Sequence, residues 1–442
     1  MKKSTLIVVV AAIALGAFVY FYDSKHNPAP PSDEASWKPA FAIKAADITR
    51  FTLESKSGNI AFAKEGNSWL ITQPVQTRAD QSAIGGIVND LSSAKIHRSF
   101  PPSDSLSKYG LDEPAVTIEF QPKGGERHTV ALGGKDFSSS LVYARIDGSK
   151  NIDTLPVSLL DETAQPLSKL RDSSVLDFNG AEISSITLND PNGGVSLAKQ
   201  ASGWQISKPK QLTADSDAVD SFTSSLSSGK FGQVASETPD DLAKYGLVHP
   251  AITLDLNTQS GQQFHLLVGK KNADNNYFAR DTSRPMIFVV ASSLYDSINK
   301  TLFDFRDKAI LHFDPSNITS MQIQNANGTI ECSQGKDGQW AIVQPAGSKG
   351  KSVQYWKILD PLQNARATQI YDSPSAGILQ HLKKPAITIT LTEKSGRTTT
   401  VEISGAQGDS IYARSTAAPE VYELKTQILT DLDLKASDLV LQ

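Results

Sequence analysis

Cysteine is almost absent from this sequence. The 442-residue chain has a single one, Cys332. One thiol cannot form an intramolecular disulfide, and it cannot supply the Cys/His ligand sets of structural zinc sites. Cys332 lies in the stretch TIECSQG, where apolar and polar residues alternate as in a strand. We therefore expect a small buried side chain rather than a nucleophile.

An excess of basic charge is also absent. The 43 lysine and arginine residues face 47 aspartate and glutamate residues, which gives a net charge of -4 and a pI near 6.0. Nucleic-acid binding requires a clustered positive surface, so we predict no nucleic-acid partner. Apolar residues make up 39% of the chain and charged residues 20%, a balance that is typical of a folded protein with a solvated surface.

The motifs of several enzyme classes are incomplete. The stretch GSKGKS, residues 347–352, resembles a phosphate-binding loop, but Pro345 stands where that loop requires its first glycine. The stretch SLSK, residues 105–108, has the spacing of penicillin-binding enzymes without their SDN and KTG partners. No HxH or HxxxH pair occurs among the histidines His26, His97, His128, His249, His265, His312 and His381. We therefore predict no catalytic residue, no metal site and no cofactor.

The N-terminus carries one long apolar run. Residues 5–22 read TLIVVVAAIALGAFVYFY and contain no charge. As a helix this run would be about 27 Å long, close to the hydrocarbon thickness of a bilayer. Two lysines precede it, so we expect residues 1–4 to be a cytoplasmic tail. The sequence thus predicts a single-pass transmembrane anchor at 5–22 in a bacterial inner membrane, with most of the chain periplasmic. A cleaved signal peptide, with its site at AIALGA, is the alternative.

The rest of the chain repeats itself. A proline-rich linker at 23–42 is followed by matching elements spaced by 135 or 136 residues, since 204 - 69 = 135 and 340 - 204 = 136. Tryptophans open the stretches WLITQP, WQISKP and WAIVQP, and prolines open PAVTI, PAITL and PAITI. These residues are Trp69, Trp204, Trp340, Pro114, Pro250 and Pro385. The period is too long for a solenoid repeat and predicts three domains, at 43–178, 179–313 and 314–442.

Each repeat combines strands with helices. Alternating runs such as ITRFTLES predict half-buried strands, and Asp80 and Asp215 stand where helix N-caps belong. Gly110 and Gly246 suit the left-handed residue that ends a helix. Strands that follow one another with helices between groups predict an α+β fold: mainly antiparallel sheets with flanking helices, after the transmembrane helix. The third repeat has diverged, because GILQHLKKP lacks the glycine.

One polar residue recurs in all three repeats. It is the arginine of an aromatic-Ala-Arg triplet, at Arg145, Arg280 and Arg414. In a strand the aromatic residue and the arginine share a face, and three such arginines would suit an anionic ligand. Alternatively, each arginine stacks on its aromatic neighbour and pairs with an acid such as Asp172 or Asp307.

With these WxIxxP, YGLxxPA and YAR elements, the chain resembles the bacterial family known as domain of unknown function 4340, in about three tandem copies. The resemblance covers nearly everything after residue 43. It implies no catalytic residues to carry over. It does imply an accessory role in the cell envelope, because family members are associated with ABC-type transport components similar to those of gliding motility.

Three functions follow as expectations. The first is a non-enzymatic, membrane-anchored scaffold or interaction protein whose partners are envelope or ABC transporter proteins. The second is a binding module for an anionic glycan, lipid or peptide. The third is an envelope hydrolase, whose Asp/Glu or Ser/His site would have to be assembled from residues distant in the sequence.

Overall fold

The protein is described here by a computed structural model, which describes residues 37–103, 105–191 and 193–441. The predicted transmembrane anchor at 5–22 lies outside these residues, as do the cytoplasmic tail and most of the linker. None of the helices within the described ranges is long and apolar enough to cross a membrane. The described helices therefore do not supply the transmembrane helix of the predicted fold class, and they do not support the predicted single-pass placement in an inner membrane.

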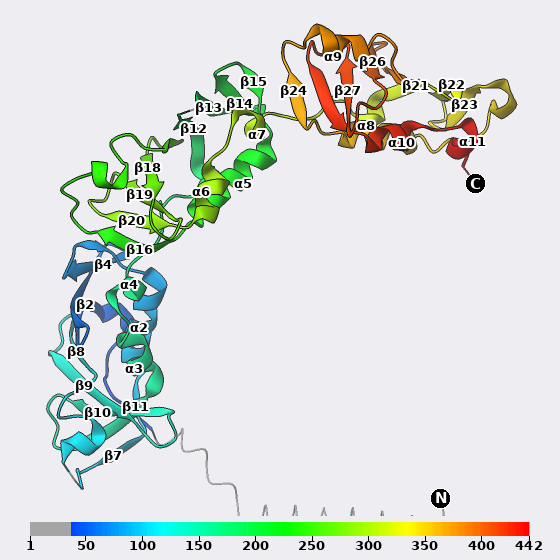
Figure 1. The fold of residues 1–442 in the computed structure, drawn as a ribbon. Coiled ribbons are helices and arrows are strands. Elements are labelled where there is room, and N and C mark those ends of the chain that lie inside the picture. The colour runs from blue at the N-terminus through cyan, green and yellow to red at the C-terminus, as the bar shows by residue number, and fades with distance from the viewer. Residues whose placement is uncertain (1–36, 104, 192, 442) are drawn as a thin grey trace, which may run out of the picture. The chain divides into compact units, whose positions relative to one another are not determined.

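The described chain is built on three large, mostly antiparallel sheets (Figure 1). The first two sheets have the same strand order. At one edge lies a short strand paired in a hairpin, and at the other edge lies a strand that follows the first long helix of the copy in the sequence. The first sheet contains, in order, β5 (Thr77–Arg78), β4 (Ser68–Gln73), β3 (Gly58–Glu65), β2 (Ile48–Ser55), β8 (Val116–Pro122), β9 (His128–Lys135), β10 (Leu141–Ile146), β11 (Ile152–Pro156) and β7 (Arg98–Phe100).

The other two sheets use equivalent strands. The second contains β15 (Leu212–Thr213), β14 (Gly203–Lys208), β13 (Gly193–Gln200), β12 (Ile183–Asp190), β17 (Ile252–Thr258), β18 (Gln263–Lys271), β19 (Tyr277–Asp281), β20 (Ile287–Val290) and β16 (Phe231–Ser236). The third contains β23 (Trp340–Gln344), β22 (Gly328–Gln334), β21 (Ile318–Asn325), β25 (Ile387–Glu393), β26 (Thr398–Ile403), β27 (Ser410–Ser415), β28 (Val421–Lys425) and β24 (Gln369–Tyr371). A small separate pair joins β1 (Lys38–Pro39) to β6 (Lys95–Ile96).

Helices cover one face of each sheet. Asp80 caps α2 (Gln81–Ser93) by accepting hydrogen bonds from two backbone N–H groups, and Asp215 caps α5 (Ser216–Ser227) in the same way from one. Both predicted N-caps are confirmed. The buried side of α2 consists of Ile84, Ile87, Val88 and Leu91. Figure 1 shows α2 beside α3 (Val157–Thr163), against which it packs. The corresponding helices are α5 and α6 (Ser292–Ile298) at the second sheet, and α8 (Trp356–Asn364) and α10 (Gln427–Leu432) at the third.

The chain divides into two compact units. The described part of one comprises residues 37–175 together with Lys230–Asp240 and Arg284–Val289. The other comprises Leu176–Gly229, Asp241–Ser283 and Val290–Gln442. The three domain boundaries expected from the sequence period stay a prediction.

A glycine contact explains the repeated Tyr-Gly stretch. Gly110 ends a short 3-10 helix (Leu106–Tyr109) with φ 64°, a left-handed conformation that favours glycine. The turn lies so close to β9 that a Cβ on Gly133 would be 2.2 Å from the carbonyl oxygen of Tyr109. Gly246 and Gly269 repeat this arrangement in the second sheet, where the corresponding distance, to the carbonyl oxygen of Tyr245, is 2.1 Å. Backbone packing therefore fixes these residues.

Candidate functional site

A buried arginine lies in the segment that follows the first sheet. Arg171 comes directly after α4 (Leu167–Leu170) and is 3% exposed. Its Nη2 donates to Oε1 of Glu237 at 2.7 Å, and its Nη1 lies 3.7 Å from the sulfur of Met286. A guanidinium removed from water needs such a charged partner, because an unpaired buried charge is strongly destabilising. We call the Arg171–Glu237 pair the first clasp.

The second unit contains the equivalent pair. Arg306 follows α7 (Leu302–Phe305), is 7% exposed, and places Nη1 2.9 Å from Oδ1 of Asp372. Its Nη2 donates to Glu420 at 3.3 Å. The spacing is identical in the two pairs, since 237 - 171 = 66 and 372 - 306 = 66. Each acid follows directly on the strand that ends its sheet, β16 or β24. We call Arg306–Asp372 the second clasp.

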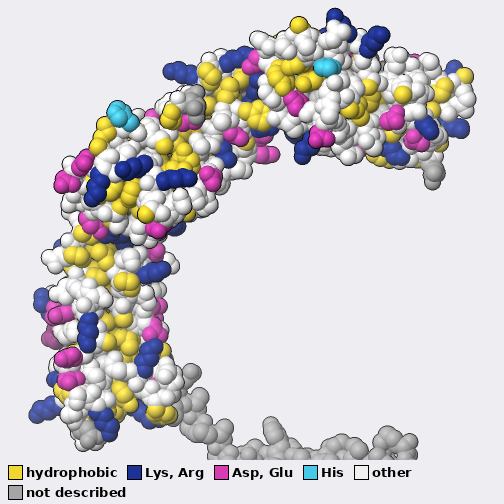
Figure 2. Space-filling model, viewed as in Figure 1, with side chains coloured by type: hydrophobic (Ala, Val, Ile, Leu, Met, Phe, Trp, Pro, Cys, Tyr) yellow, Lys and Arg dark blue, Asp and Glu magenta, His cyan; other side chains and the backbone are white. Residues whose placement is uncertain are grey.

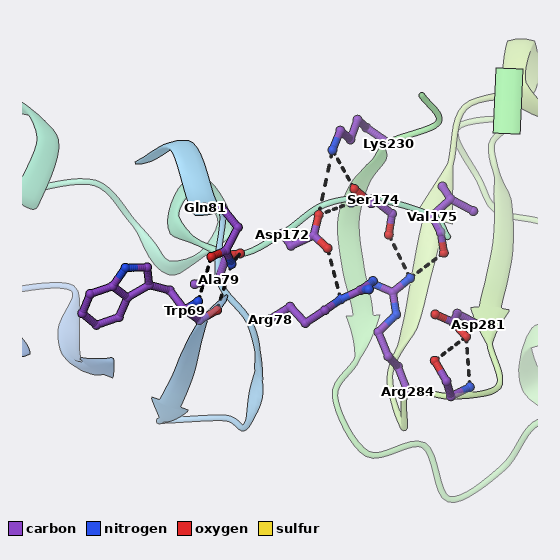
Figure 3. A network of polar contacts seen from close by, with 11 residues as sticks. Trp69, Arg78, Ala79, Gln81, Asp172, Ser174, Val175, Lys230, Asp281 and Arg284 are labelled. Atoms are coloured by element: carbon purple, nitrogen blue, oxygen red, sulfur yellow. Dashed lines mark hydrogen bonds and ion pairs between the residues drawn. The ribbon is translucent and has the colours of Figure 1, made fainter. Parts of the chain in front are cut away.

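The aspartate after Arg171 is held by two cations (Figure 3). Arg78 approaches one carboxylate oxygen of Asp172 to 3.2 Å, and Lys230 approaches the other to 3.9 Å. Burial alone would raise the pKa of Asp172. Hydrogen bonds from Ser174, with the charges of Arg78 and Lys230, outweigh it and lower the pKa instead. The carboxylate therefore stays charged and fixes the start of the segment that leaves the first sheet.

A further arginine holds the end of the same segment. Arg284 donates through Nη2 to the carbonyl oxygens of Ser174, at 2.8 Å, and Val175, at 2.5 Å (Figure 3). Its guanidinium lies 5.2 Å from the ring centre of Phe288 and 5.9 Å from that of Phe231. These are cation–π distances, which suit a planar guanidinium at a buried position. Charged side chains thus hold this segment at Asp172, Ser174 and Val175.

The three arginines predicted to bind an anion lie on three different sheets. Arg145, on β10, donates to the carbonyl oxygens of Gly148 and Ser149 in the turn that follows. Arg414, on β27, binds the carboxylate of Glu402 on the neighbouring strand at 2.5 Å. Arg280, on β19, is half-buried and lies opposite Leu267. Anion binding by these residues stays a prediction. Pairing of these arginines with Asp172 or Asp307 is not seen for Arg145 or Arg414, because each has a nearer partner.

The aromatic residue of each triplet packs on the turn described above. Tyr143 meets the ring of Tyr109 with centres 5.1 Å apart, and Phe278 meets Tyr245 at 5.0 Å. In the third sheet Tyr412 stacks on His381 at 5.5 Å. His381 therefore stands where the other two sheets have a tyrosine. The turn retains its aromatic contact although the glycine after it is missing.

The repeated tryptophans have matching surroundings. Trp69, Trp204 and Trp340 are 6%, 4% and 6% exposed. The carbonyl oxygen of each accepts a hydrogen bond of 3.1 Å from the backbone N–H of Ala79, Ala214 and Val353 respectively. Each stretch that starts at such a tryptophan ends in a cis proline, Pro74, Pro209 or Pro345. Pro114, Pro250 and Pro385 lie just before β8, β17 and β25.

Two carboxylates face one another where α2 and α3 pack. Glu162 on α3 and Asp90 on α2 each have a buried oxygen without a hydrogen-bond partner. Burial raises the pKa of Glu162, and the charge of Asp90 raises it further. His–Asp pairs occur elsewhere, between His128 and Asp147, His265 and Asp255, and His312 and Asp307. In the described ranges no group of three or more His, Cys, Asp or Glu is placed to hold a metal ion.

The open face of the first sheet forms a wide hollow. It has a volume of about 880 Å³. Exposed residues of β2, β3 and β8 line it, among them Arg50, Thr52 and Glu119, with Arg127 at its margin. Side chains on this face alternate along β2 with the buried Phe51 and Leu53. The face is polar, and Figure 2 shows basic and acidic side chains interspersed over the visible surface.

A family described as a domain of unknown function (DUF4340) matches two segments of the chain, residues 69–205 and 204–380. Together they cover more than half of the sequence, so the chain belongs to this family. The matches begin at Trp69 and Trp204, which are one sequence period apart. No curated protein matches the chain.

Proposed function

We propose that the protein is a non-enzymatic interaction or scaffold component built from three copies of this family's unit, of which residues 314–442 are the third and most diverged. Backbone hydrogen bonds at equivalent positions of the three sheets support this proposal. The N–H groups of Asp80, Asp215 and Gln354 donate to Leu170, Phe305 and Leu439 respectively. The same backbone hydrogen bond therefore occurs once in each copy. In the third copy, Val440 stands at the position of the clasp arginine.

The pair of clasps is the observation that carries the proposal. Arg171 and Arg306 are buried at equivalent positions and reach acids at the same sequence distance. We infer that each pair specifies one arrangement of the segments it joins, because a buried ion pair is a poor source of net stability. In this chain the most deeply buried paired arginines serve to join successive copies. Joining of this kind suits a scaffold, in which each copy offers its own surface to a partner.

We place the partner contact on the open face of the first sheet. Arg50, Lys123 and Arg127 lie there with Glu65 and Glu119, so the surface offers both signs of charge and several hydrogen-bonding groups. Such a surface suits a polar protein partner, bound through a wet interface with complementary charges. The family resemblance indicates an ABC-type transport component as this partner.

Capture of the partner tests the proposal. The tagged full-length protein should recover a transport ATPase or permease subunit from cells that express it. The double substitution R50E/R127E should reduce recovery at least tenfold without changing the circular dichroism spectrum. K56E is the matched control, because Lys56 is 80% exposed in the β2–β3 turn and does not line the hollow. Recovery of no such subunit by the wild type, or equal recovery by R50E/R127E, would refute the proposal.

A further inference from the structure

The third copy contains a cavity beside the segment that leads into its sheet. It has a volume of about 190 Å³ and lies between the third sheet and the segment that leads into it, residues 309–313. Apolar walls come from Leu311, Phe313, Ile318 and Leu391, of which Ile318 and Leu391 are almost fully buried. Thr399 on β26 also lines the cavity and is 9% exposed.

Strand register shows why the cavity is there. Thr399 pairs with Leu391 in the third sheet, as Phe264 pairs with Leu256 in the second and His128 with Phe120 in the first. Thr399 is therefore the structural equivalent of two aromatic residues. The other sheets carry a ring at this position, and the third carries a side chain of three heavy atoms.

The rings in the other copies fill the equivalent space. Phe264 packs against Phe178 of the segment leading into the second sheet, with ring centres 5.6 Å apart. In the first sheet the ring of His128 lies 5.0 Å from Phe41 and 5.4 Å from Phe120. Phe313 keeps its place in the third copy, equivalent to Phe178, but its partner ring is missing. The site thus retains half of an aromatic pair.

The mouth of the cavity is polar. Arg397 donates through Nε to Oε1 of Glu393 at 3.1 Å and also through Nη2, which forms a close ion pair. Equivalent register positions of Glu393 hold Pro122 and Thr258 in the other sheets, where no such pair forms at the mouth. Because the two charges compensate each other, the rim favours a neutral ligand with a hydrogen-bonding group over an anion.

Volume restricts the ligand to one ring. A drug-sized ligand needs roughly 300 Å³ or more, whereas an apolar cavity of roughly 150 Å³ takes up benzene. We propose that this cavity binds a single neutral six-membered aromatic ring, which takes the place of the ring that Phe264 and His128 supply elsewhere in the chain. The ring is either a free small molecule or a phenylalanine or tyrosine side chain of a partner.

The test uses p-cresol as the probe, with saturation followed by ligand-observed NMR on the full-length protein. We expect one site with a dissociation constant on the order of 1 mM, as befits a ligand of eight heavy atoms. T399F restores the ring found in the second copy and should weaken binding at least tenfold while raising the melting temperature. T400F is the matched control, because Thr400 points to the opposite face of the same strand and bonds Thr390. It should bind like the wild type.

The reverse substitution supplies an independent arm. F264T should open the same space in the second copy and raise the stoichiometry from one p-cresol to two. Parallel titration with N-acetylphenylalanine amide assigns the source: binding of both probes indicates a partner side chain, and binding of p-cresol alone indicates a free small molecule. Absence of saturable p-cresol binding to the wild type, or undiminished binding to folded T399F, would overturn the proposal. Should T399F fail to fold, an unchanged stoichiometry in F264T would overturn it equally.

Discussion

Replacing Glu237 by glutamine measures the strength of the first clasp. The Arg171 side chain is 2% exposed and lies 2.7 Å from the Glu237 carboxylate. Removing one partner from a fully buried ion pair costs about 3–5 kcal/mol, because the remaining charge is left uncompensated. The Glu237 side chain is 39% exposed, so water screens part of the attraction. We therefore expect E237Q to lower local stability by about 2 kcal/mol.

Substitution of the other partner should cost less. R171M removes the buried charge itself and retains most of the apolar stem, so no ion is left without a counter-ion. The double variant R171M/E237Q should match R171M within about 0.5 kcal/mol. In the second clasp, D372N should cost only about 1 kcal/mol, because Glu420 remains 3.3 Å from Arg306.

Hydrogen exchange measured by mass spectrometry reads this effect where it arises. Peptides that cover residues 169–176 and 230–238 report on the segments that the clasp joins. A loss of about 2 kcal/mol corresponds to roughly thirtyfold faster exchange in these peptides. A peptide from β12 or β13 serves as internal control and should not change. Equal exchange in E237Q and the wild type, or a larger loss in R171M than in E237Q, would refute this account of the clasp.

Three further predictions concern single side chains. E162Q should raise the melting temperature at pH 7, because the raised pKa of Glu162 means that its charged form destabilises the fold; the gain should vanish as pH falls below the ordinary value of about 4.5. G133A should destabilise by about 3 kcal/mol in urea unfolding, since its Cβ would lie 2.2 Å from the oxygen of Tyr109, whereas G85A, with open space around it, should be neutral or stabilising. Burial raises the pKa of Cys332 to about 11, so Ellman's reagent at pH 8 should react only after unfolding; prompt reaction with the folded protein would contradict the burial.

The sequence period and the amphipathic patterns predict most of the strands and helices of the fold. The helix faces at Ile84, Ile87, Val88 and Leu91 and the caps Asp80 and Asp215 follow from local physics, so they were predictable from residue type and spacing alone. The transmembrane helix was inferred from apolar length without any packing information, and the finding for the described helices does not support it.

The site residues were harder to predict from the sequence, because their partners are set by tertiary contacts. Glu237 and Asp372 are one period apart, since 372 - 237 = 135, and this signal would have found the clasps. In both copies the acid is followed by a hydroxyl residue and a proline, in SETP for Glu237 and in YDSP for Asp372, but this pattern does not reveal the buried arginine that each acid contacts. The arginines of the aromatic-Ala-Arg triplets were noticed because their local sequence repeats. Yet their partners, a turn carbonyl for Arg145 and Glu402 for Arg414, depend on neighbouring strands that the triplet does not specify.

The short edge strands of the sheets limit the exchange of strands during folding. Three sheets of similar sequence within one polypeptide invite exchange of strands between copies, and between molecules, while the chain is folding. The outermost hairpin strands, β5 at Thr77–Arg78 and β15 at Leu212–Thr213, are two residues long. An intruding segment would gain only a few hydrogen bonds there. Lengthening either of these margins should turn a monodisperse preparation into one that aggregates.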